Sequence, residues 1–138
     1  MKLICFGFLL LLIACAQDTK QTVGTNTPNN NLQITDDDRI ETGKSIFLQK
    51  CASCHSINMN LTGPALKGVS KRWENKEKLY EYIRNPQAVI AKSNYAKELF
   101  YKWNKVPMPP FAYLTDDDIN SILLYVKSGS SKKQNELQ

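Results

Sequence analysis

The stretch GKSIFLQKCASCH, residues 43–55, holds two cysteines separated by two residues, with a histidine directly after the second. The sequence of 138 residues contains four cysteines and one histidine. Cys5 lies in an N-terminal apolar run and Cys15 follows that run, so Cys51 and Cys54 remain beside His55 in the rest of the chain. The pattern C-x-x-C-H therefore decides what the fold must accommodate.

Covalent attachment of a haem explains the spacing of these three residues. Two thiols add across the two vinyl groups on one edge of a haem, and the next side chain places an imidazole nitrogen on the iron. We therefore predict that Cys51 and Cys54 bind one haem c covalently and that His55 is an axial ligand of its iron.

Three other uses of the pattern stay open on the sequence alone. A structural zinc site usually needs four ligands, and no further Cys or His remains after these three. A thioredoxin-like redox pair is typical of a βαβ context, and no alternating run here is long enough for a sheet. A structural disulfide between Cys51 and Cys54, with His55 incidental, is the third alternative.

Met108 is the candidate for the second axial position, because no second histidine exists to fill it. Met1 would leave with the N-terminal segment. Met59 is four residues from His55, about 13 Å of extended chain, which is hardly long enough to reach the opposite face of a haem. Met108 lies in VPMPPF, where prolines fix the backbone and remove competing donors. A thioether opposite histidine raises the reduction potential and closes the iron to small molecules. An ordinary core role for Met108, beside a vacant or Lys-ligated iron, is the alternative.

Four stretches predict helices, and we find no strand, so the domain is expected to be all-α. ITDDD at 34–38 and LTDDD at 114–118 both place a Thr N-cap before three acids at the positive end of a helix dipole. Gly43 in mid-helix predicts close approach of another helix backbone, with a tolerated surface glycine as the alternative. Gly129 should lie just beyond the last helix. The predicted helices span residues 36–50, 76–84, 95–103 and 116–127.

Residues 1–14 predict a signal peptide. The 12 residues from 3 to 14 are apolar except Gly7, follow Lys2, and are too few to span a bilayer. LIAC at 12–15 resembles the lipobox of bacterial lipoproteins, where cleavage leaves Cys15 first and diacylated; a free thiol is the alternative. Residues 15–33 then form a lipidated cysteine and a polar flexible linker. We expect an exported protein on the periplasmic side of a bacterial membrane, anchored through Cys15.

The composition fits one modest globular domain, which we place at residues 34–129, before a polar tail at 130–138. The sequence contains 18 Lys and Arg residues and 13 Asp and Glu residues, which gives a net charge of +5; 42% of all residues are apolar and 22% are charged. No second apolar run approaches 18 residues, which excludes an integral channel or transporter. Thinly spread basic residues in an exported chain indicate that nucleic acid is not a partner.

With these residues placed, residues 36–127 resemble the class I cytochromes c, small monohaem electron carriers with His/Met ligation. The likeness rests on residues 43–55, on GPALKG at 63–68, and on the segments 79–86 and 122–127. The resemblance implies the small cytochrome c fold, with four to five helices packed around one haem.

The same resemblance implies roles for several side chains near the haem. The carbonyl of Pro64 would accept a hydrogen bond from His55, which makes the histidine a better donor to iron. Tyr82 would approach the ligand sulfur, and the last helix would cross the first at Gly43 and Phe47. Trp73 would either donate to a haem propionate or serve as a plain core aromatic.

We expect an electron carrier and not an enzyme. The protein would shuttle single electrons between respiratory or other redox partners at a membrane surface, without binding a small-molecule substrate. A haem enzyme or its subunit, and a gas-binding module, are the alternatives. Residues 44 to 78 contain seven basic residues and only two acidic ones. This excess predicts a positive surface around the haem edge that docks acidic redox proteins. An ordinary solvated face would explain them equally. The seven are Lys44, Lys50, Lys67, Lys71, Arg72, Lys76 and Lys78.

Overall fold

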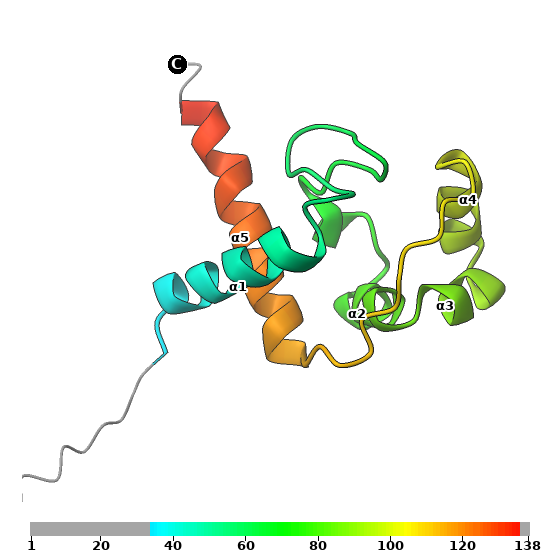
Figure 1. The fold of residues 1–138 in the computed structure, drawn as a ribbon, viewed down its shortest axis with the longest axis horizontal. Coiled ribbons are helices and arrows are strands. Elements are labelled where there is room, and N and C mark those ends of the chain that lie inside the picture. The colour runs from blue at the N-terminus through cyan, green and yellow to red at the C-terminus, as the bar shows by residue number, and fades with distance from the viewer. Residues whose placement is uncertain (1–33, 136–138) are drawn as a thin grey trace, which may run out of the picture. The chain divides into compact units, whose positions relative to one another are not determined.

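The computed structural model describes residues 34–135 of the chain (Figure 1). The predicted signal peptide at 1–14, Cys15 with the linker at 15–33, and residues 136–138 lie outside the described residues. Helices and no strands make up the described part, which confirms the all-α prediction. The helices are α1 (Asp36–Lys50), α2 (Lys76–Arg84), α3 (Pro86–Lys92), α4 (Asn94–Lys102) and α5 (Asp116–Asn135), with a short 3₁₀ turn, η1 (Val69–Lys71).

Both long helices begin at the Thr-Asp-Asp-Asp pattern, as predicted. The Asp38 backbone N–H donates to the Thr35 hydroxyl at 3.2 Å, and the Thr35 backbone N–H donates to the Asp38 carboxylate at 3.0 Å. Thr115 and Asp118 repeat this reciprocal pair at 3.1 Å and 2.9 Å. These capping boxes satisfy N–H groups that have no partner inside a helix, so the sequence marks both starts to the residue.

The last helix is longer than predicted, because α5 continues through Gly129 to Asn135. The prediction that the helix ends before Gly129 is therefore wrong, and the domain boundary predicted at residue 129 falls inside a helix. A Cβ added at Gly129 would overlap the side chain of Ile57, so this glycine makes room for a neighbouring loop within the helix. The Ser130 hydroxyl donates to the carbonyl of Val126 at 2.7 Å, which is a bond made within the helix.

The middle of the chain folds into three short consecutive helices, one of which the sequence patterns did not predict. Asn85 follows α2, and its side chain accepts a bond from the Ala88 N–H at 3.2 Å, while Pro86 takes the first position of α3. The Asn-Pro pair thus ends one helix and begins another, where we expected only an end. Ser93 caps α4, which begins one residue earlier than predicted.

The α1 and α5 helices cross each other beside the α2–α4 region (Figure 1). Gly43 lies at this crossing, where an added Cβ would overlap the backbone carbonyl of Ser121. The Phe47 ring packs on Tyr125 with 5.4 Å between centroids. The predicted close approach at Gly43 is therefore confirmed. None of the described helices combines the length and apolar character that a membrane crossing requires.

One apolar core joins all five helices and two connecting segments. Its buried side chains come from each helix, from the loop before α2 and from the segment between α4 and α5. The buried members are Phe47, Trp73, Leu79, Tyr80, Val89, Ala96, Phe111, Leu114, Ile119, Ile122 and Val126.

Candidate functional site

A cleft enters this core from one side, and its empty space is about 1330 Å³ when the part open to solvent is included. The end of α1, the loop at residues 53–73, α2, α4, the segment 103–115 and α5 all contribute to its walls. Every haem-site residue predicted within the domain lines this one cleft. They are Cys51, Cys54, His55, Pro64, Trp73, Tyr82 and Met108.

A tight turn after α1 gathers the C-x-x-C-H residues at one wall of the cleft. The Cys51 N–H still donates to the Phe47 carbonyl at 2.8 Å, and the Cys51 carbonyl accepts from Cys54 at 3.1 Å and from His55 at 2.9 Å. Because these bonds wind the backbone through a helix-like turn, both thiols and the imidazole line the same cavity. Cys51 and Cys54 are both free thiols, and no disulfide joins them.

His55 is oriented by its backbone neighbours in the next loop. Its Nδ1–H donates to the carbonyl of Pro64 at 2.9 Å, the hydrogen bond that the resemblance implied. Since a carbonyl can only accept, the proton is on Nδ1 and the lone pair of Nε2 remains free for a metal. Gly63 lies against the imidazole ring, and its N–H donates to the Cys54 carbonyl at 2.8 Å. Two hydrogen bonds therefore join the loop at Gly63 and Pro64 to the C-x-x-C-H motif.

Met108 lines the cleft from the segment between α4 and α5, and its side chain is half-buried. Met59 does not line the cleft and is 61% exposed. Of the methionines in the described residues, Met108 is therefore the one placed to reach a group bound in the cleft. Asn104 and Lys105, with φ of 55° and 57°, turn the chain into this segment. Asparagine adopts this left-handed conformation more readily than most residues, whereas a lysine there has no sequence signal.

An aromatic wall closes another part of the cleft. Trp73 is 8% exposed, and its ring packs on Tyr82 at 4.8 Å and edge-on against Tyr95 at 5.0 Å. Burial, and next the neighbouring Tyr95, raise the pKa of Tyr82, which keeps its hydroxyl protonated at neutral pH.

Sequence reasoning did not assign the side chains that α4 contributes to the cleft. They recur at helical spacing on α4 and at its C-cap, and this periodicity could have marked one face as buried. They are Tyr95, Leu99, Phe100 and Trp103.

Two of the alternative uses of the cysteines fit this geometry poorly. Burial, with a further effect from Cys54, raises the pKa of Cys51 to about 11, whereas a redox-active thiol needs a lowered pKa. Within residues 34–135, no cluster of three or more His, Cys, Asp or Glu side chains is close enough to hold a metal ion. An apolar cleft with two thiols, a free imidazole nitrogen and a thioether fits a haem instead.

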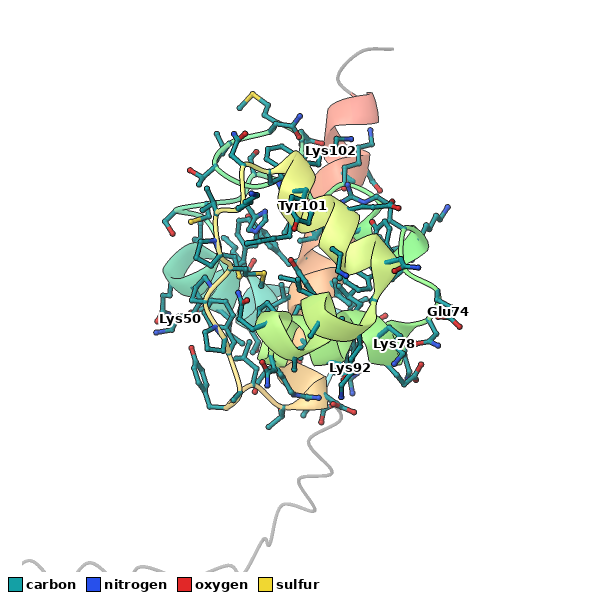
Figure 2. The ribbon with its side chains drawn as sticks, turned by 90° about the vertical axis from the view of Figure 1, so that its right-hand side faces the viewer. Lys50, Glu74, Lys78, Lys92, Tyr101 and Lys102 are labelled. Carbon is teal, nitrogen blue, oxygen red and sulfur yellow. The ribbon has the colours of Figure 1, made fainter. Side chains whose placement is uncertain are left out.

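Two of the seven basic residues predicted to surround the haem edge lie at the cleft. Lys50 and Arg72 line the cleft. Lys78 pairs with Glu81 at 3.4 Å and lies across the molecule from Lys50 (Figure 2). Positive charge from Lys50 and Arg72 therefore lies at the cleft, and the charge of Lys78 does not lie beside that of Lys50 (Figure 2).

Comparison with known proteins agrees with this geometry. The family model described as cytochrome c matches residues 40–130, which are most of the described residues. The chain belongs to the cytochrome c family. This cytochrome c therefore binds haem c covalently, and the chemistry of its family is haem-based electron transfer.

Individual relatives confirm the class I c-type cytochrome prediction. The cytochrome is 32% identical over 72 residues to cytochrome c-551 of Pseudomonas denitrificans, which covers 51% of this chain and 78% of the relative. The solved structure of a cytochrome c from Rhodothermus marinus is similar with a TM-score of 0.61 and 25% identity, over 70% of this chain and 81% of that one. An engineered form of the same protein, at 24% identity and a TM-score of 0.59 over 70% and 81% of the two chains, supports the fold alone.

Proposed function

We propose that this cytochrome c is a single-electron carrier whose haem is attached through Cys51 and Cys54 and ligated by His55 and Met108. The observation that carries the proposal is the cleft, which brings Met108 to the same cavity as His55 although 53 residues separate them in the chain. When bound, the haem supplies an iron that takes up and releases one electron.

The chain's own residues hold and tune that iron. Donation from His55 Nδ1–H to the Pro64 carbonyl at 2.9 Å fixes the ring and increases the basicity of Nε2. The Met108 sulfur is a weaker donor than a second imidazole and favours a higher reduction potential. Apolar side chains around the cleft exclude water and lower the local dielectric constant, which also tunes the potential.

Carbon monoxide tests the proposed ligation in the reduced holoprotein. We expect the unmutated protein to bind carbon monoxide slowly, because Met108 must leave the iron first, and the Met108→Ala variant to bind it rapidly. Met59→Ala is the matched control, since Met59 is exposed and away from the cleft. Rapid binding by the unmutated protein would instead indicate an open iron, as in a gas-binding module or a peroxidase.

We also propose that a lipid on Cys15 tethers the domain to the periplasmic side of a bacterial membrane, with residues 15–33 as the linker. The support is the apolar run that ends in LIAC and the polar stretch after it. Two acyl chains hold a soluble domain durably where one would not. In fractionated cells the unmutated protein should sediment with membranes and Cys15→Ala should be soluble, with the same haem spectrum. Equal partition of the two would contradict the anchor.

The proposed partners are redox proteins, respiratory or other, with acidic docking surfaces. Lys50 and Arg72 support this because they place positive charge at the cleft, and rim charges act mainly on association rates. Electron exchange with an acidic partner should slow as ionic strength rises, and Lys50→Gln should reduce that slope more than Lys78→Gln, whose charge lies across the molecule (Figure 2). A rate that does not respond to salt in any of the three proteins would contradict steering.

A further inference from the structure

The segment that carries Met108, residues 103–115, is fixed at two ends and not in its middle. At its start the backbone N–H groups of Asn104 and Lys105 donate to the carbonyls of Tyr101 at 3.2 Å and Phe100 at 3.0 Å. These bonds close the left-handed turn that follows α4. They hold the beginning of the segment to the end of that helix.

The other end is attached to α2. The Phe111 N–H donates to the carbonyl of Ile83 at 3.2 Å. The neighbouring Arg84 donates from Nε to the carbonyl of Leu114 at 2.8 Å, and its Nη2 pairs with the Asp116 carboxylate at the start of α5. One guanidinium therefore bonds both to Leu114, near the end of the segment, and to Asp116, the first residue of the following helix.

Between these two anchors the backbone of residues 107–110 makes no hydrogen bonds within the described part of the chain, although the Met108 side chain packs against the core. Pro107, Pro109 and Pro110 lack an N–H, and no backbone hydrogen bond joins residues 107–110 to another described residue. The position of the Met108 sulfur therefore depends on the stiffness of the proline rings, on the packing of its side chain against the core and on the two anchors. Both anchors include a residue that lines the cleft, Phe100 at the first and Ile83 at the second.

We propose that Arg84 is a positioning residue that holds Met108 at the haem iron by clamping the segment to α2 and α5. This inference rests on the proposed ligation by Met108. Arg84 is suited to the task because its rigid, planar guanidinium donates to two acceptors from two different nitrogens, whereas a lysine presents its donors on a single rotatable nitrogen. Its guanidinium also lies 6.0 Å from the ring centroid of Tyr80. The Arg84 bond to Leu114 is partly buried, whereas the Asp116 side chain is 78% exposed.

The test measures Met108 dissociation in the holoprotein, through carbon monoxide binding to the reduced form and through the long-wavelength absorption of sulfur-ligated ferric haem. We expect Arg84→Met to bind carbon monoxide about tenfold faster and to weaken the ferric band. Lys78→Met is the matched control, because it removes one positive charge and one ion pair from the same helix. It should stay within about twofold of the unmutated protein.

Two further variants separate positioning from general destabilisation. Gly43→Ala disturbs the α1–α5 crossing and lowers stability without touching the segment, so it should leave the carbon monoxide rate unchanged well below its melting temperature. Arg84→Lys keeps the charge but loses one of the two bonds, and should give an intermediate rate. It also decides the matter if Arg84→Met yields no holoprotein.

The outcomes are distinct. Arg84 variants that bind carbon monoxide as slowly as Lys78→Met overturn the positioning role while leaving Met108 ligation intact. Rapid binding by the unmutated protein overturns the ligation itself, and with it this inference. Faster binding confined to the Arg84 variants supports both.

Discussion

Gly63 is the residue at which the smallest added group would reach the predicted iron ligand. A Cβ at this position would overlap the imidazole of His55, whose Nδ1 is bonded to the adjacent Pro64 carbonyl. We expect Gly63→Ala to displace the ring, to cost about 2 kcal/mol of stability through overpacking, and to shift the reduction potential. Chemical denaturation and a potentiometric titration of the holoprotein measure both effects.

Gly68→Ala is the matched control for that variant. Gly68 has a φ of 69° and nothing near its added Cβ, so alanine there costs about 1 kcal/mol by backbone strain alone. Its potential should match that of the unmutated protein. If the two variants shift the potential equally, contact with His55 is not the cause.

At this scale the sequence identified residues whose chemistry is covalent or scarce. The shared position of Cys51, Cys54 and His55 at the cleft could be predicted because haem attachment fixes their types and spacing, and the position of Met108 there because few sulfur donors exist. The role of Arg84 could not be predicted. It depends on contacts with residues distant in sequence, and no local pattern encodes such contacts.

The helix caps make the stability of individual elements depend on pH. Hydrogen bonds from the Thr115 side chain and then its backbone hold the pKa of Asp118 below its ordinary value of 3.8. A carboxyl whose pKa is lowered by folding stabilises the fold above its unfolded pKa, and this contribution is lost as the pH falls through the folded value. Asp38 makes the same pair with Thr35 at the start of α1, and its pKa is lowered for the same reasons.

We therefore expect Asp118→Asn to lower the melting temperature at neutral pH and to have a shrinking effect as the pH falls below about 4. Asp117→Asn is the control, since it removes the same charge from the same turn while the Asp118–Thr115 pair stays in place. Thermal melts of the ferric holoprotein across this pH range compare the three proteins. A difference between Asp118→Asn and the unmutated protein that persists undiminished in acid would contradict the expectation.

The α1–α5 crossing has a separate requirement, namely closeness of two backbones. Gly43→Ala should cost about 3 kcal/mol, because the added methyl meets the fixed carbonyl of Ser121 and not a mobile side chain. Ser45→Ala, at an exposed position of the same helix, should change stability by less than about 0.5 kcal/mol. Denaturant unfolding of the two variants provides the comparison. Equal costs would mean that the helices can separate at no penalty.

Element boundaries could be predicted where a side chain itself makes the terminating or initiating bond. Thr35, Thr115 and Asn75 all cap their helices, and α1 and α2 have the predicted limits. The end of α5 could not be predicted from Gly129, because a helical glycine that accommodates Ile57 looks the same in sequence as one that terminates a helix. The α3 helix was not predicted, because Asn85 is both the C-cap of α2 and the N-cap of α3.

Across the described part of the molecule, about half of the buried core side chains also form the walls of the cleft. Leu79, Phe111, Leu114, Ile122 and Val126 are all buried, and all line the cleft. Without a group in the cleft, these side chains would lose the packing contacts on that side, and the rest of the core would have to stabilise the fold. The haem that the family binds covalently therefore completes the core as well as the redox site.

It follows that the protein without haem should not hold this fold. We expect a Cys51→Ser, Cys54→Ser double variant to lose the cooperative melt seen by circular dichroism, because the residues that pack on the haem would face an open cavity, and each unfilled methylene-sized space costs about 1 kcal/mol. Ser53→Ala, in the same turn with both thiols kept, should mature and melt like the unmutated protein. A native-like cooperative transition in the double variant, with no haem absorption, would show that the helices alone supply the core. If the double variant loses its cooperative melt as expected, we expect residual structure in the α1–α5 pair, which packs through Gly43 and Phe47.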